Sequence, residues 1–147
     1  MATLQEMLLT PDTQPKVLDD CETLIGQELS EKSGVSGNAV KLAHKVVTSF
    51  APGYYRKMLA DLVPQMVIRL EPFWADFGTS GGSGFGDYLA KRGEEVSEAL
   101  LSVTDAAAGS SERPAVLKAY RSVRGNAGKH VEAALPRLGD MIVKYAA

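Results

Sequence analysis

Hydrophobic residues recur every three or four positions along most of the chain, which is the period of an amphipathic α-helix. Between residues 13 and 34 acidic residues fill the opposite positions, and the apolar stripe consists of Val17, Leu18, Cys21, Leu24, Ile25 and Leu29. The same spacing returns in each later stretch, and no segment of useful length alternates with the period of two of a β-strand. The pattern therefore predicts an all-α protein.

Capping and helix-breaking residues divide these stripes into about six main helices plus a short N-terminal helix. Thr3 and Glu6 form a capping-box pattern that opens the short helix. We expect main helices to begin near residues 13, 36, 54, 87, 111 and 126. No good capping residue stands just before Pro64 or Pro136, so a kinked continuous helix is favoured at both prolines. Pro72 is expected to end the helix that begins at Tyr54, or to start a short new turn.

A nine-residue stretch occurs twice, at 39–47 and at 115–123. The copies are identical at four of nine positions, where average residue usage predicts fewer than about one. The spacing from Gly53 to Pro64 equals that from Gly125 to Pro136, although the alignment needs a four-residue deletion before Gly125. We interpret the chain as one domain built from two three-helix repeats with pseudo-twofold symmetry, at about 13–77 and 87–146, joined by a glycine-rich linker at 78–86.

Charge follows the same division. The first helix of each half is acidic, and the helices after it are basic through Lys41, Lys45, Arg56, Lys57, then Lys118, Arg121, Arg124 and Lys129. The whole chain of 147 residues has a formal net charge of −2, which gives no electrostatic case for nucleic acid or an anionic membrane as a partner. The single cysteine, Cys21, fits a reducing compartment. We expect no signal peptide, because the first residues carry no basic segment, and the longest apolar run, 62–70, is too short to span a bilayer. We expect a soluble cytoplasmic protein.

The sequence contains only weak matches to motifs for catalysis, phosphate binding or metal binding. The glycines at 81–86 resemble a phosphate loop, but no strand precedes them and Asp87 would repel phosphate, so the linker interpretation is preferred. His44 and His130 are the only histidines and lack further ligands at metal-binding spacing, so we expect no metal and no cofactor. An enzyme that uses Arg69, His44 or Tyr120 ranks last. We expect both histidines to be residues of the charged rim. The alternative is that His44 and Tyr120, which occupy the same repeat position, face each other across the pseudo-twofold axis and form a small polar site.

Two functional hypotheses remain. The first is a non-enzymatic interaction or scaffold module that binds a protein partner or itself as a homodimer. Its candidate interface is an aromatic cluster, which would otherwise be core, at Phe73, Trp74, Phe77, Phe85 and Tyr88. The alternative is a carrier of a small apolar ligand held between the repeats. Its cavity would be lined by Met58, Val63, Met66, Leu135 and Leu138, together with His44 and Tyr120.

Overall fold

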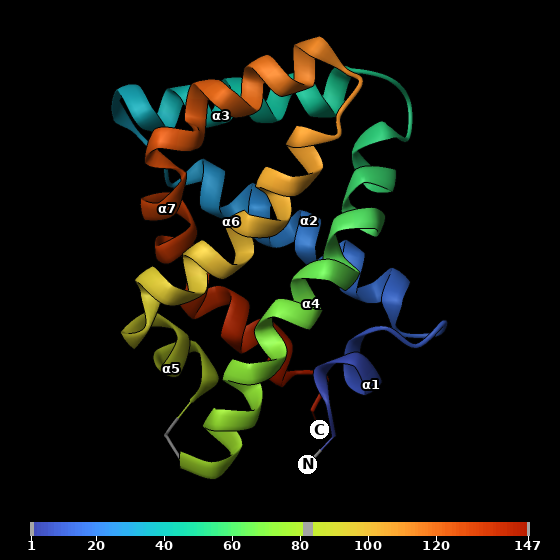
Figure 1. The fold of residues 1–147 in the computed structure, drawn as a ribbon, viewed down its shortest axis with the longest axis vertical. Coiled ribbons are helices and arrows are strands. Elements are labelled where there is room, and N and C mark those ends of the chain that lie inside the picture. The colour runs from blue at the N-terminus through green and yellow to red at the C-terminus, as the bar shows by residue number, and fades with distance from the viewer. Residues whose placement is uncertain (1, 81–83, 147) are drawn as a thin grey trace.

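Seven α-helices make up nearly all of the chain that the structure, a computed structural model, describes, namely residues 2–80 and 84–146 (Figure 1). They are α1 (Leu4–Leu8), α2 (Gln14–Ser30), α3 (Gly34–Ser49), α4 (Tyr54–Ser80), α5 (Phe85–Lys91), α6 (Gly93–Gly109) and α7 (Pro114–Val143). These ranges contain no β-strand. The all-α expectation is confirmed, and so is the capping box of Thr3 and Glu6 at the start of α1.

Two helices are longer than the sequence predicted. The helix α4 continues through both Pro64 and Pro72, so the expectation that Pro72 ends it is wrong. The two helices expected near 111 and 126 are the single helix α7, which also contains Pro136. A proline inside a helix removes one backbone hydrogen bond, and burial on both sides of Pro72, at Leu70 and Trp74, holds α4 together despite that loss.

The predicted helix from Asp87 to Gly109 is instead divided at Arg92 into α5 and α6. Gly93 marks the break, and a Cβ at that position would lie 2.7 Å from a carboxylate oxygen of Glu132 on α7. Helix also enters both ends of the predicted linker, since α4 runs to Ser80 and α5 begins at Phe85. Residues 81–83 of that linker lie outside the described residues.

The helix boundaries of the two halves do not match. After the first copy of the repeated stretch the chain turns at Pro52 and Gly53, and Gly53 takes a positive φ of 77°. The second copy has no proline at this point, and α7 continues straight through Gly125. The three-plus-three repeat with pseudo-twofold symmetry is not shown and stays a prediction.

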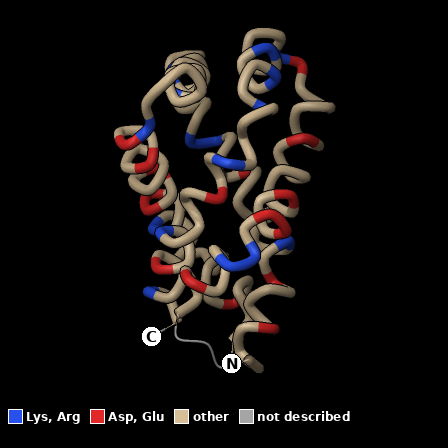
Figure 2. The backbone as a smooth tube through the Cα atoms, turned by 90° about the vertical axis from the view of Figure 1, so that its left-hand side faces the viewer, with Lys and Arg blue, Asp and Glu red and all other residues tan. Residues whose placement is uncertain are grey.

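Packing divides the molecule into a solid end and an open end. At the solid end, α1, α5 and α6 pack against α4, and the last turns of α7 pack against α5. The fully buried side chains here include Leu4, Phe85, Leu89, Val96 and Leu135. At the other end, α3 and the first half of α7 lie side by side and form an upper layer, seen in Figure 1 and, after a quarter turn, in Figure 2. Gly37 is the only buried residue of α3, and α7 has none before Leu135. The upper layer therefore covers this end without filling it.

None of the described helices combines the length and the apolar character that crossing a membrane requires.

Candidate functional site: an apolar cavity under the upper layer

A cavity of about 380 Å³ lies between the upper layer and helices α2, α4 and α6. Five helices contribute to its wall, and most of the lining side chains are apolar. The lining consists of Ile25, Leu29, Val40, Ala43, His44, Val47, Tyr54, Tyr55, Met58, Leu59, Leu62, Met66, Thr104, Ala107, Ala108, Ser111, Val116, Leu117, Ala119, Tyr120 and Val123. Apart from the buried Leu59 and the exposed Ala107, these residues are half-buried. Part of each side chain faces the cavity, although Ile25, Tyr55 and Met66 also pack against the core.

The repeated stretch supplies the roof of this cavity. Its inward positions on α3 are Val40, Ala43, His44 and Val47, and the equivalent positions on α7 are Val116, Ala119, Tyr120 and Val123. Helical spacing places each set on one face of its helix. The alanines, with Ala107 and Ala108 of α6, leave the space that larger side chains would occupy.

The polar groups in the wall are held in their neutral forms. The Tyr120 hydroxyl donates to a carboxylate oxygen of Asp105 at 2.5 Å and lies 2.7 Å from the hydroxyl of Thr104. Asp105 in turn accepts from Arg124 Nε at 2.8 Å. Burial, with the Asp105 hydrogen bond, raises the pKa of Tyr120 to about 12. These hydrogen bonds fix the orientation of Tyr120. Its hydroxyl hydrogen is bonded to Asp105 and is therefore not available to donate to a ligand.

His44 and Tyr55 form the second polar part of the wall. Their rings meet edge to face with centroids 5.1 Å apart. Burial lowers the pKa of His44, which favours the neutral imidazole, and burial raises the pKa of Tyr55 to about 12. The Tyr55 hydroxyl is buried and has no hydrogen-bond partner among the described residues. This side of the cavity therefore carries neutral polar groups, and within the described part of the chain the Tyr55 hydroxyl is free to bond a ligand.

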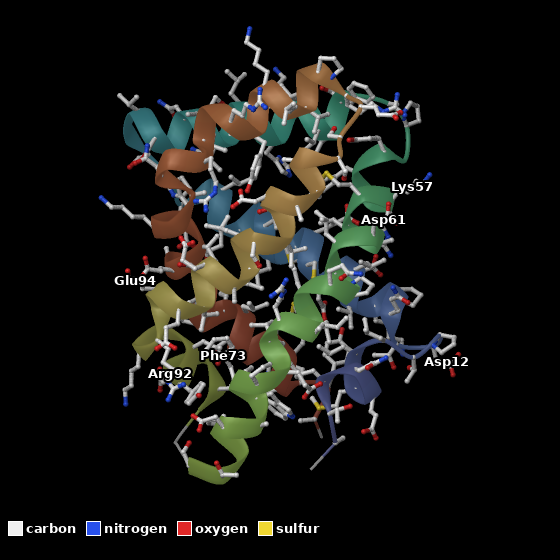
Figure 3. The ribbon with its side chains drawn as sticks, viewed as in Figure 1. Asp12, Lys57, Asp61, Phe73, Arg92 and Glu94 are labelled. Carbon is white, nitrogen blue, oxygen red and sulfur yellow. The ribbon has the colours of Figure 1, made fainter. Side chains whose placement is uncertain are left out.

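A charged cleft adjoins the cavity at one side. It shares Tyr54, Met58, Leu62 and Ala107 with the cavity wall, and its outer residues include Lys57, Asp61 and Arg113. Lys57 and Asp61 extend from α4 on the outside of the molecule (Figure 3). The Arg113 guanidinium lies 5.5 Å from the ring centre of Phe50. Water-exposed charges thus border an apolar interior.

The structure separates the seven residues that the sequence suggested as ligand lining. His44, Met58, Met66 and Tyr120 line the cavity, and their role in binding stays a prediction. Val63 and Leu135 are buried in the packed core, and Leu138 packs against that core. His44 and Tyr120 line the same cavity from α3 and α7, but their contacts differ: His44 meets Tyr55, whereas Tyr120 bonds Thr104 and Asp105.

Sequence reasoning missed the remaining wall, above all Val40, Ala43, Val116, Ala119 and Val123. The signal was present, because all five lie in the repeated stretch, at the inward positions of its two copies.

The aromatic cluster is internal to the chain. Trp74 and Phe85 are buried with ring centroids 4.9 Å apart, and Phe77 and Tyr88 pack around them. The Trp74 indole donates to the carbonyl of Ala2 at 2.9 Å, which ties the N-terminal segment to α4. Trp74 and Phe85 therefore present no surface to a partner. An interface role stays a prediction for the half-exposed Phe73, Phe77 and Tyr88.

Two further kinds of candidate site are a metal-binding cluster and the single cysteine. Among the described residues there is no group of three or more His, Cys, Asp and Glu that could hold a metal ion. Burial beside Asp20 raises the pKa of the Cys21 thiol to about 11, which disfavours the reactive thiolate.

Comparison with known proteins places the chain in a family without assigning it an activity. Neither the curated proteins nor the solved structures give a match. A family model described as "Family of unknown function (DUF6918)" matches residues 4–146. The chain belongs to this family.

Proposed function

We propose that the protein binds a small, mainly apolar molecule in the cavity under the upper layer and serves as its carrier or sensor. The observation that supports this is a cavity of about 380 Å³ whose wall is almost entirely apolar. Sites for small molecules commonly measure about 300–1,000 Å³. An engineered apolar cavity of roughly 150 Å³ holds one benzene, so by proportion this cavity has room for about 15 non-hydrogen atoms.

The energetics of the upper layer also favour a ligand. The helix α3 contributes no fully buried apolar side chain to the core, so its half-buried Val40 and Val47 have few partners across the cavity. A ligand would supply those contacts and remove apolar surface from water. Because it would bind only the folded chain, a concentration of about 100 times Kd would stabilise the fold by about 2.7 kcal/mol.

Filling the cavity from within tests this function. Ala119→Phe places a ring in the wall on α7, and the matched control Ala115→Phe makes the same change at an exposed position of the same helix. The neutral dye Nile red is the probe, and its fluorescence reports transfer into an apolar site. We expect Ala119→Phe to weaken dye binding at least about tenfold, since the ring takes the ligand's volume.

The control is expected to bind the dye as the wild-type protein does. Circular dichroism verifies that both variants are folded. Wild-type protein that fails to bind the dye, or an Ala119→Phe variant that binds it equally well, would contradict the proposal. Native mass spectrometry of freshly purified protein supplies the ligand's mass.

A second candidate function is self-association, and one exposed side chain favours it. Ile68 on α4 is 58% exposed, and it lies on the same helix as the half-exposed Phe73. A second copy of the chain would cover the exposed Ile68 side chain. The oligomeric state in solution tests this candidate.

A further inference from the structure

The upper layer concentrates positive charge that the whole-chain balance conceals. Residues 34–49 and 114–131, which are α3 and α7 as far as one residue before Glu132, contain six Lys and Arg and no Asp or Glu, while the chain as a whole has a net charge of −2. The six are Lys41, Lys45, Lys118, Arg121, Arg124 and Lys129. Figure 2 shows basic residues on the two helices at the upper end and most acidic residues further down. The fold thus brings basic helices that are far apart in the sequence together at one end of the molecule.

Five of these six cations are available to a partner. Arg124 is bound to Asp105 across α6 and α7. The other five are exposed, and none forms an ion pair within 4.0 Å among the residues that the structure describes. On α7, Lys118, Arg121 and Lys129 share one helix face by their spacing, opposite the face that lines the cavity.

Apolar side chains accompany the lysines on α3. Val35 and Leu42 are 90% and 64% exposed and lie seven residues apart, which places them on one outward face of the helix. Lys41 and Lys45 border the same face. Exposed valine and leucine beside lysines gain nothing from water or from a phosphodiester backbone, but they can enter the headgroup region of a lipid bilayer.

We propose that the upper layer binds the surface of an anionic lipid bilayer. The five exposed cations supply the attraction to acidic headgroups, and Val35 and Leu42 insert shallowly among them. Basic residues near such a surface contribute enough to change the partition about fivefold each. The inward face of the same two helices forms the roof of the cavity, so the layer would stand between bilayer and cavity. The inference does not depend on the cavity holding a ligand.

Sedimentation with vesicles tests the proposal directly. The probes are phosphatidylcholine vesicles with and without about 30% phosphatidylserine. We expect binding only to the anionic vesicles and its loss at high salt, where charges are screened beyond a few ångströms. Two double variants each remove two of these charges. One combines Lys41→Gln with Lys45→Gln, the other combines Lys118→Gln with Arg121→Gln, and each should weaken vesicle binding about 25-fold. The control pair Lys16→Gln with Lys91→Gln removes the same charge from exposed, unpaired positions outside the layer and should change binding less than about twofold.

The substitution Leu42→Asn tests the insertion of apolar side chains, because it leaves the charge of the upper layer unchanged. It should weaken vesicle binding while Ile68→Asn, an equal change on α4, does not. The proposal is overturned if wild-type protein does not bind the anionic vesicles, if it binds neutral vesicles equally, or if the control pair is as damaging as the layer pairs. Preference for duplex DNA over vesicles would also overturn it. Nile red binding is measured on the same variants. Loss of ligand binding in the cavity and loss of vesicle binding by the upper layer are thus distinguished.

Discussion

His44 is the residue whose surroundings have the clearest consequence in solution. It is half-buried in the cavity wall with its ring edge against Tyr55, and burial lowers its pKa. In the unfolded chain the pKa returns to about 6.5. The unfolded state therefore binds more protons than the folded state at mildly acidic pH, and stability rises with pH in that range. The contribution of His44 is present above about pH 6.5 and is lost as pH falls through the folded pKa.

We predict that the free energy of unfolding decreases between about pH 7 and about pH 5, and that His44→Phe makes this decrease smaller. Phenylalanine keeps an aromatic ring against Tyr55 and removes the titrating group. Urea denaturation at the two pH values measures the effect. Burial also lowers the pKa of His130, so His130 contributes to the same decrease in the free energy of unfolding. His130→Phe is therefore the matched comparison, and it should leave the contribution of His44 to this decrease unchanged. An unchanged pH dependence in His44→Phe would contradict the prediction.

Single residues also show what periodicity can and cannot predict. Tyr120 and Leu135 follow the same helical spacing on α7, yet Tyr120 lines the cavity and Leu135 is buried in the core. Spacing identifies the inward face of a helix but not what that face meets. The sequence could therefore suggest a cavity and some of its lining, but it could not separate lining from core.

At the scale of the elements, α5 and α7 meet at a pair of glycines. A Cβ at Gly139 would lie 2.3 Å from the backbone of Gly86, and a Cβ at Gly86 would lie 2.6 Å from the carbonyl oxygen of Pro136. Backbone atoms cannot move aside as a flexible side chain can. The close approach of these helices seals the core around Phe85 and Leu135.

We predict that Gly139→Ala destabilises the protein by about 3 kcal/mol, because the added methyl group forces the two helices apart. Gly125→Ala is the matched control on the same helix, where a Cβ meets nothing within 4 Å. It should stabilise the fold by up to about 1 kcal/mol through the better helix propensity of alanine. Urea denaturation of both variants gives the free energies. A Gly139→Ala protein as stable as wild type would show that the helices can separate at little cost.

Helix boundaries were predictable only where local chemistry decides them. The capping box at Thr3 and the turn at Gly53 were legible in the sequence. The passage of α4 through Pro72 was not, because the burial of Trp74 in the next turn outweighs the local cost of the proline. The break between α5 and α6 at Arg92 and Gly93 was not predicted, because a single glycine inside a helical pattern is too weak a signal to place a helix end.

For the whole molecule, helical periodicity was sufficient to predict the all-α class. It could not show that one end is solid and the other open, since both ends carry similar apolar stripes. Nor did the net charge reveal the basic upper layer. The basic helices were visible in the sequence, but only the packing of α3 beside the first half of α7 joins Lys41, Lys45, Lys118 and Arg121 into one surface.

The last prediction concerns the number of copies in solution. If α4 carries the surface for a second copy, the protein should be a dimer at tens of micromolar by light scattering. Ile68→Glu should then shift it to the monomer, because a desolvated, unpaired carboxylate at the centre of a contact costs several kcal/mol. Leu42→Glu makes the same change on α3, where Leu42 is as exposed as Ile68, and should leave the dimer intact. If the wild-type protein is a monomer, self-association is not its function. If Leu42→Glu dissociates the dimer and Ile68→Glu does not, the contact between copies lies on the upper layer, where a second copy and a bilayer would compete for the same surface.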